Sequence, residues 1–379
     1  MRLLASLALI IGLGLPVQVL AQQPAITLAG APELYLSHAD MTCDTSSSLS
    51  QRDVTDVPVT AFRRQDGTVA VISGNQNNFY LEGLSVDQAS RTTCGDLVTS
   101  VNDPDPSHFN ARRWLFAIYA IDYQHVLGFV HNEYHGDDHY PDDCKISSRR
   151  NFECWYGATT LVVSKDGGRT FETPPVPGNV LAALPWKFSK AKLKAGTTSP
   201  KVVGNPHDKL IYVMVDDFDM NRKLRARQCL LRGNGLDLNG WRAWDGKGFD
   251  LDMESPYVVQ RSGDCATVLP FIVNSVKYLP QFDRFVALGI RHHEVVYTFS
   301  PDMVTWSKPQ VLMTYQLMQT WEPGKDAARA YFSLLDPDSS SINFDTLEKR
   351  PYVYFVQYGT DPQNFLRQSS VYRQRIEIN

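Results

Sequence analysis

Five groups of short apolar runs follow one another along the chain, and this repetition constrains the fold more than any other feature of the sequence. The groups lie at residues 59–84, 114–163, 200–231, 276–299 and 331–376, and turn signals separate the runs within each. We find no convincing amphipathic helix longer than about three turns. A period of roughly 50–70 residues predicts an all-β fold, a five-bladed β-propeller with blades of about four antiparallel strands. A β-sandwich is the alternative.

The first residues have the composition of a targeting segment. Arg2 is followed by an almost wholly apolar stretch at residues 3–15, and the small Ala21 ends the segment. This pattern predicts a secretory signal peptide, residues 1–21, with cleavage after Ala21. No later stretch approaches about 18 apolar residues, so we expect a secreted or periplasmic protein without a membrane span.

The rest of the chain is expected to form one domain. Residues 22–52 are polar and rich in Ser and Thr, which predicts an N-terminal lead-in segment. Residues 53–379 then form a single β-propeller domain, because propellers of this length often fold as one unit. We expect the C-terminal strand, residues 370–378, to close the ring against the first blade, since an open ring would expose strand edges. We also expect a monomer.

Six cysteines lie in the part of the chain that would be exported: Cys43, Cys94, Cys144, Cys154, Cys229 and Cys265. An even number in an oxidising compartment predicts three disulfides. Among the about fifteen pairings that six cysteines allow, sequence order suggests Cys43–Cys94, Cys144–Cys154 and Cys229–Cys265. A zinc site is the alternative, but the sequence has no C-x-x-C pair.

The charge of the chain bears on its partners. The formal charge is -4 and becomes -5 when Arg2 is removed with the signal peptide. This balance argues against a nucleic-acid partner. No cofactor is expected.

A polar cluster that follows an apolar run is the strongest sign of chemistry in the sequence. It contains His131, Glu133 and His135. Because side chains alternate along a strand, these three share one face, and Asn132 and Tyr134 take the other. Two imidazoles and a carboxylate are costly to desolvate, which favours a functional site centred on Glu133. A buried hydrogen-bonded network and a metal site formed by the same three residues are the alternatives.

Propeller topology places the start of each innermost strand and the end of each second strand on one face of the disc. This topology gathers acidic residues from three different blades on that face: Asp56, Glu133 and the pair Asp216–Asp217. The residues that we expect to bind a substrate on this face are His131, His135, Asn132, Tyr134, Arg112, Arg291, Arg329 and Trp155. Two or more arginines pointing inward would favour an acidic glycan. Strand caps, surface arginines and core packing are the structural alternatives.

Two turns share a pattern typical of propeller blades. Ser164–Phe171 matches S-x-D-x-G-x-T-W/F at every defined position, and Ser300–Trp306 is a relative that is one residue shorter. In such a turn the Asp accepts backbone N–H groups, a Gly takes the positive φ, and the aromatic ring tucks under the blade. Both turns resemble the Asp boxes of sialidases and other BNR-repeat proteins.

The number of blades, together with Asp56-Val-Pro58 at the start of the first blade, resembles five-bladed furanosidases of the arabinanase/levansucrase type. Sialidases have Arg-x-Pro there, and this chain has Asp56 in place of the Arg. The resemblance implies a glycoside hydrolase that acts on an oligo- or polysaccharide. It implies that Asp56 is the base or nucleophile and that Glu133 is the acid, with a pKa raised by burial. Asp216 or Asp217 would orient the sugar or tune Glu133.

Two other functions fit the same residues. A polysaccharide lyase would use a His or Tyr, such as His131 or Tyr134, to abstract a proton. A non-catalytic glycan-binding or interaction propeller would need no pair of carboxyl groups. Carboxyl geometry discriminates among the three, because two inward carboxyl groups about 5–10 Å apart favour hydrolysis.

Overall fold

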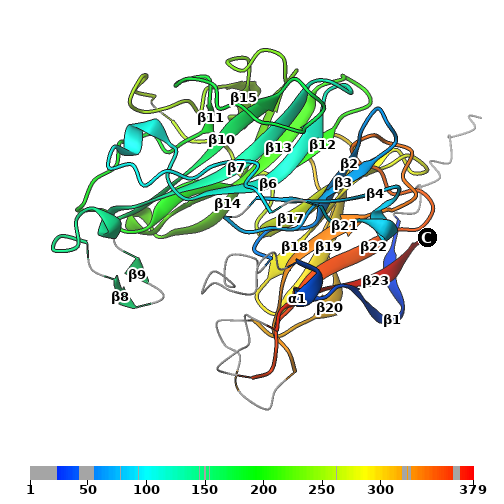
Figure 1. Cartoon of the computed structure of the whole chain (residues 1–379). Helices are drawn as coiled ribbons and strands as arrows, with labels where there is room; N and C mark the ends of the chain where they lie inside the picture. The colour runs from blue at the N-terminus through cyan, green and yellow to red at the C-terminus, as the bar shows by residue number, and fades with distance from the viewer. Residues whose placement is uncertain are drawn as a thin grey trace, which may run out of the picture.

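The chain is nearly all-β in its computed structural model, which describes residues 24–41, 55–76, 78–92, 94–144, 146–148, 151–152, 154–261, 263–317, 322, 326–361 and 368–379 (Figure 1). In these ranges the one α-helix is the short α1 (His38–Met41). The 3₁₀ helices are Val86–Gln88, Pro106–His108, Gly136–Asp138 and Met220–Arg222. The predicted signal peptide lies outside the described residues.

The strands form five antiparallel meanders in chain order. The first contains β2 (Thr60–Arg63), β3 (Val69–Ile72), β4 (Tyr80–Gly83) and β5 (Ser90–Arg91). The second contains β6 (Arg113–Ala120), β7 (Val126–His135), β10 (Trp155–Ser164) and β11 (Val180–Ala182). The third contains β12 (Ala195–Gly204), β13 (Ile211–Asp219), β14 (Leu224–Gly233), β15 (Arg242–Trp244) and β16 (Phe249–Leu251).

The fourth and fifth meanders follow the same plan. The fourth contains β17 (Ile272–Leu279), β18 (Arg284–Arg291), β19 (Glu294–Ser300) and β20 (Gln310–Thr314). The fifth contains β21 (Arg329–Leu335), β22 (Tyr352–Gln357), β23 (Ser370–Ile378) and β1 (Ile26–Leu36). A small separate hairpin is formed by β8 (Ile146–Ser148) and β9 (Asn151–Phe152).

Glycines join the second and third meanders into one sheet. β10 and β12 run parallel there, with Tyr156 opposite Ala195 and Gly157 opposite Gly196. A Cβ atom on Gly196 would lie 2.7 Å from the Gly157 Cα, so the two backbones approach this closely only because residue 196 lacks a side chain. The junction matters for the site, because Gly157 is also paired with Glu133 on β7.

Apolar clusters pack each meander against the next. One cluster contains Ile72 of the first meander and Leu115 of the second. Similar clusters join the second to the third, the third to the fourth, and the fourth to the fifth. A further cluster, with Val71 and Val356, joins the fifth meander to the first. β3 is covered on both faces, so its four residues are all apolar and buried rather than alternating.

The first and last described strands pair with each other in the fifth meander. β23 lies between β22 and β1, and Ile26 is paired with Ile378 (Figure 1). Both edges of the C-terminal strand are therefore paired within its own sheet, and it meets the first meander through side chains such as Val371 rather than by strand pairing. β1, inside the expected lead-in segment, supplies the outer edge. Most of its side chains are exposed, so its sequence lacks the apolar pattern of the other strands.

The two motif turns make the hydrogen bonds that their sequences predict. Asp166 accepts the backbone N–H groups of Arg169 and Thr170, both at 3.0 Å. Gly167 and Gly168 have φ values of 71° and 78°. In the shorter turn Asp302 accepts the N–H groups of Val304 and Thr305, at 2.9 and 2.6 Å.

Two of the predicted disulfides, Cys144–Cys154 and Cys229–Cys265, are present. Cys94 is also disulfide-bonded, and Cys43, its predicted partner, lies outside the described residues. Disulfides are typical of extracellular and periplasmic proteins. Within the part of the chain that the structure describes, no helix has the length and apolar character needed to cross a membrane.

Candidate active site

A pocket of about 170 Å³ lies where strands from all five meanders meet. It is lined by Asp56, Trp114, Phe116, His131, Glu133, Ser199, Lys201, Asp216, Ile272, Asn274 and Tyr331. The structure thus brings together three of the four acidic residues that the sequence singled out, each from a different meander. Asp56 precedes β2, Glu133 is near the end of β7, and Asp216 is near the end of β13.

Strand alternation on β7 positions the centre of the pocket as predicted. His131, Glu133 and His135 are partly exposed, whereas Asn132 and Tyr134 between them are buried. Asn132 donates its side-chain N–H to the carbonyl of Ala111. Tyr134 donates its hydroxyl to the carbonyl of Pro104 at 2.9 Å. Both side chains therefore stabilise the back of the strand, and the structure does not bring them into the pocket that was expected to bind a substrate.

Glu133 is surrounded by hydrogen-bond donors. His135 Nε2 and Trp155 Nε1 lie 2.7 and 3.0 Å from Oε2, and His131 Nε2 lies 3.1 Å from Oε1. His131 Nε2 is at ion-pair distance but makes no hydrogen bond within the described residues, so the acceptor sites of Oε1 are left for a water molecule or a substrate.

These donors fix the ionisation of Glu133. Burial on its own would raise the pKa of this carboxyl, but the interactions with His131 and His135 outweigh burial and hold the pKa well below its usual range. The expectation of a raised pKa at Glu133 is wrong for this reason. The carboxyl is held as the anion.

Asp56 has the opposite environment. Burial raises its pKa to about 6, although the hydroxyl of Tyr331 and the indole N–H of Trp114 donate to it and lower the pKa. The Trp114 Nε1 atom is 3.1 Å from Asp56 Oδ2. The negative charge of Glu133 adds to the upward shift. Two carboxyl groups of one pocket thus have pKa values displaced in opposite directions.

Asp216 forms a buried ion pair at the wall of the pocket. Lys201 Nζ and Gln228 Nε2 both donate to its Oδ1 atom, each at 2.7 Å. Lys201 is 5% exposed, so the pair is shielded from water. Within the described residues Oδ2 accepts no hydrogen bond, which leaves it for a ligand.

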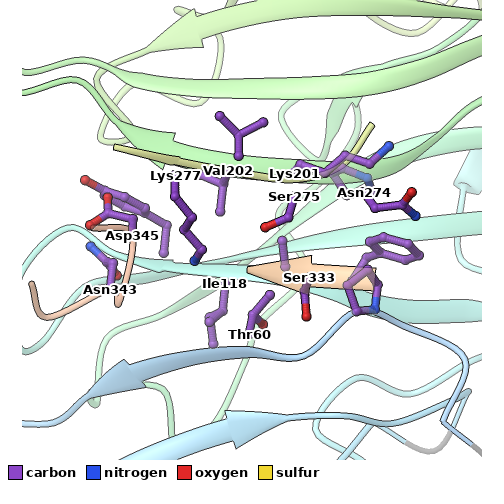
Figure 2. A pocket seen from close by; sticks show the side chains of 16 residues that line it. Thr60, Ile118, Lys201, Val202, Asn274, Ser275, Lys277, Ser333, Asn343 and Asp345 are labelled. Carbon is purple, nitrogen blue, oxygen red and sulfur yellow. The ribbon is translucent and has the colours of Figure 1, made fainter. Parts of the chain in front are cut away.

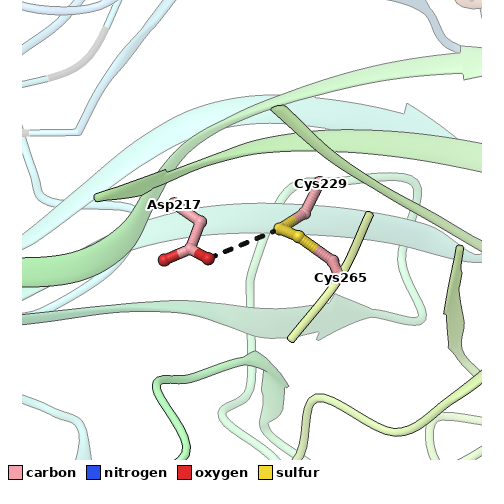
Figure 3. Close-up of side chains that lie close together, drawn as sticks. All are labelled: Asp217, Cys229 and Cys265. Carbon is pink, nitrogen blue, oxygen red and sulfur yellow. Dashed lines mark hydrogen bonds between the residues drawn. A yellow bond between two sulfur atoms is a disulfide. The ribbon is translucent and has the colours of Figure 1, made fainter. Parts of the chain in front are cut away.

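Asp217 is not part of this pocket. It follows Asp216 on β13 and therefore points to the opposite face of the sheet, where Arg227 donates to it. Cys229 and Cys265 lie beside it, and the Cys229 sulfur is 3.8 Å from Asp217 Oδ2 (Figure 3). Among the described residues these three form the one tight group of metal-ligand types. The disulfide removes both thiolates, so the group is not suited to hold a metal ion.

The three arginines expected to bind a substrate have different surroundings. Arg112 donates to both oxygens of Asp138 at 2.7 Å, and Arg291 pairs with Glu294 at 2.8 Å. Both pairs are exposed and already neutralised. Arg329 instead lies over the ring of Phe355 at the wall of a second pocket.

This second pocket has a volume of about 680 Å³ and is lined by His293, Thr314, Tyr315, Gln316, Asp326, Ala327, Arg329 and Gln357. Arg329 donates its Nε–H to Gln357 Oε1 at 3.1 Å, and its terminal nitrogens form no hydrogen bond within the described residues. The buried Tyr315 hydroxyl has no partner there either. Arg329 begins β21, the strand that also carries Tyr331, so the two pockets are neighbours.

Trp155 supports the site rather than stacking on a ligand. It is 4% exposed, its indole N–H is bonded to Glu133, and the Lys194 ammonium lies 4.2 Å from its ring centroid. The sequence analysis missed Trp114, Lys201 and Tyr331. Lys201 alone had a visible signal, because a lysine inside an apolar inner strand must find a buried partner.

Comparisons with known proteins find structural likeness without sequence likeness. No family model matches the chain, and no curated protein matches it. An endo-arabinase from Bacteroides thetaiotaomicron VPI-5482 is 9% identical, with a TM-score of 0.48 over 86% of this chain and 96% of that one. A putative exo-beta-1,3-galactanase from Bifidobacterium bifidum s17 is 12% identical, with a TM-score of 0.46 over 90% and 91%.

A third solved structure, an N-acetylgalactosamine deacetylase from F. plautii, is 11% identical and has a TM-score of 0.47 over 92% of this chain and 96% of that one. The activities of these three proteins differ, and likeness at this level identifies none of them as the activity of this chain.

Proposed function

We propose that the protein is a glycoside hydrolase with Asp56 as the general acid and Glu133 as the ionised base or nucleophile. The five meanders are then the blades of a single propeller domain, and the catalytic pocket lies at one end of its centre. The apolar cluster shared by the first and fifth meanders supports ring closure. The assignment reverses the roles that the family resemblance implied.

One observation carries this proposal: carboxyl groups from different meanders line one pocket, and their pKa values are displaced in opposite directions. Glycoside hydrolysis needs one protonated and one ionised carboxyl group across the bond to be cleaved. Asp56, with a pKa of about 6, retains a proton in mildly acidic solution. Glu133 is ionised over the same range, and its Oε1 atom can accept a hydrogen bond from water or attack a sugar carbon.

Asp216 and Lys201 complete the pocket in this proposal. The ion pair fixes Oδ1 of Asp216 and leaves Oδ2 to accept a sugar hydroxyl. Trp114 and Phe116 add flat apolar surface of the kind that packs against a sugar ring.

A panel of neutral and acidic oligosaccharides tests the function, with new reducing ends and unsaturated products read in parallel. Hydrolysis produces reducing ends alone. Unsaturated products would instead identify a lyase in which His131 removes a proton, and binding without any product would identify a non-catalytic propeller.

The pH dependence follows from Asp56. Asp56 can act as the acid only while its carboxyl is protonated. We therefore expect kcat/KM to be constant below about pH 6 and to fall about tenfold per pH unit above it. Glu133 stays ionised throughout, so it should add no acidic limb above pH 4. Initial rates from pH 4 to 8 measure this profile. A profile that rises through pH 6 would show that Asp56 acts as the anion.

The terminal nitrogens of Arg329, which form no hydrogen bond within the described residues, lead us to propose an acidic glycan as the substrate. Arg329→Met should raise KM about tenfold or more for an oligosaccharide that carries a carboxylate or sulfate, and should leave a neutral analogue within about twofold. Arg291→Met is the matched control, because Arg291 is already paired with Glu294. Equal effects of Arg329→Met on both substrates would contradict the proposal.

Export and oligomeric state remain proposals. We propose that the protein is secreted or periplasmic after cleavage following Ala21, and that it is a monomer. N-terminal sequencing of the mature protein and its mass in solution test these two statements.

A further inference from the structure

A narrow channel adjoins the catalytic pocket along the centre of the molecule. Its volume is about 30 Å³, and each meander contributes one inner strand to its wall (Figure 2). Among the residues that line it are Thr60, Ile118, Val202, Lys277 and Ser333. The volume exceeds the roughly 10–15 Å³ that a single water molecule needs, so the channel has room for a small occupant.

Several polar atoms in the wall of this channel have no partner in the described part of the chain. They are Thr60 Oγ1, Asn274 Oδ1 and Ser333 Oγ, from β2, β17 and β21. Ser333 is 2% exposed, so bulk water does not satisfy its hydroxyl. Because buried polar groups are almost always hydrogen-bonded, these atoms indicate an occupant. The two hydroxyls can donate to it, whereas Asn274 Oδ1 can only accept and also lines the catalytic pocket.

Lys277 gives the channel its positive charge. Its side chain extends into the channel, and its ammonium donates to the carbonyl of Phe344 at 2.7 Å (Figure 2). An ammonium has three protons, so two are left for another acceptor. No carboxylate of the described residues lies within 4.0 Å of it, unlike Lys201, which is paired with Asp216.

The other titratable groups on the channel wall form no ion pair with Lys277, although the negative charge of Asp345 acts on its ammonium. They are Tyr119, Lys201 and Asp345. Asp345 accepts the backbone N–H of Gly204 at 2.9 Å through Oδ2 and the hydroxyl of Ser341 through Oδ1. A metal cation would be repelled by the ammonium, whereas an anion would satisfy the ammonium and the two hydroxyls together.

We propose that the channel binds one small inorganic anion of the size of chloride, held by the Lys277 ammonium and the hydroxyls of Thr60 and Ser333. The site is separate from the proposed reaction, since its three donors do not line the catalytic pocket. It touches that pocket only through Phe116, Lys201 and Asn274, which line both spaces.

Thermal unfolding tests the anion site. At one ionic strength, sodium chloride should raise the Tm by about 2 °C or more relative to sodium gluconate, because an anion bound only by the folded state stabilises it. Lys277→Met should abolish the difference, and Lys247→Met, at an exposed turn, should keep it. Burial lowers the pKa of Lys277 to about 8, so the chloride effect should fade as the pH rises above 8.

Crystals of the wild-type protein grown in sodium bromide give a readout that does not depend on the folding of a variant. An anomalous peak should lie in the channel within hydrogen-bond distance of Lys277 Nζ, and Thr60→Val should weaken it. A channel that contains only water in bromide, or a chloride effect that Lys277→Met leaves unchanged, would overturn the proposal.

Discussion

The variant Asp56→Asn should lose about 10²–10⁴-fold in turnover and at the same time gain stability at neutral pH. The loss of turnover follows from the missing proton donor. The gain in stability follows from the raised pKa, because a buried carboxyl that resists ionisation destabilises the fold wherever it is forced to ionise.

The sign of the stability effect depends on pH. The pKa of Asp56 is about 6 in the folded state, above the value of about 3.9 for an unfolded chain. Its contribution to stability is therefore complete below about pH 4 and is lost as the pH rises through 6. Above pH 6 the free-energy cost of keeping the ionised Asp56 carboxylate buried approaches about 3 kcal/mol. The Asp56→Asn substitution removes this cost.

Part of this gain is offset. Tyr331 and Trp114 both donate to Asp56, and an Asn side chain has one oxygen to accept from them. We therefore expect a net gain of about 1–2 kcal/mol at pH 7 and none at pH 4. Urea unfolding at the two pH values measures it. Asp250→Asn, at an exposed position, is the control. A variant less stable than the wild type at pH 7 would contradict the raised pKa.

Glu133→Gln should lose as much turnover as Asp56→Asn and, unlike that variant, should also lose stability. The substituted Gln amide has one oxygen, so it can accept from His135 and Trp155 in one orientation only, and in the other its own N–H groups face these donors. Leaving buried donors unpaired should cost about 2–4 kcal/mol at pH 7. Because the pKa of Glu133 is lowered, the wild-type contribution is present at neutral pH and lost on acidification, so the two proteins should converge in acid.

The control for this variant is Glu294→Gln, which breaks an exposed ion pair with Arg291. Exposed pairs contribute about 0–1 kcal/mol, so this variant should unfold close to the wild type. Urea unfolding of both variants, alongside the oligosaccharide assay, separates the two effects. A Glu133→Gln protein that is as stable as the wild type would show that the donor network does not hold the carboxylate.

Sequence reasoning predicted which side chains lie together better than it predicted their ionisation. The alternation of strand side chains placed His131, Glu133 and His135 on one face, and blade topology grouped Asp56 with Glu133. The direction of each pKa shift could not be predicted, because it is the balance between burial and the neighbouring hydrogen bonds and charges. His131 and His135 outweigh burial at Glu133, whereas burial outweighs the Tyr331 hydroxyl at Asp56, and the degree of burial is set only by the packed fold.

For the fold, too, features set by local sequence were predicted and features set by long-range packing were not. Local patterns predicted the short strands, the tight turns and two disulfides. The pairing of β1 with β23 was missed, since it joins the first and last described strands and the exposed side chains of β1 give no strand signal. The choice between Asp216 and Asp217 depended on the register of β13, which a pair of adjacent acidic residues leaves open.

The identity of the general acid is tested most directly by leaving-group dependence. On a glycan that the wild type cleaves, kcat/KM of Asp56→Asn should fall by about 10³-fold for a natural sugar leaving group. For an activated aryl glycoside of the same sugar, whose leaving group needs no proton, it should fall less than about tenfold. Equal losses on both substrates would contradict the assignment of Asp56 as the acid.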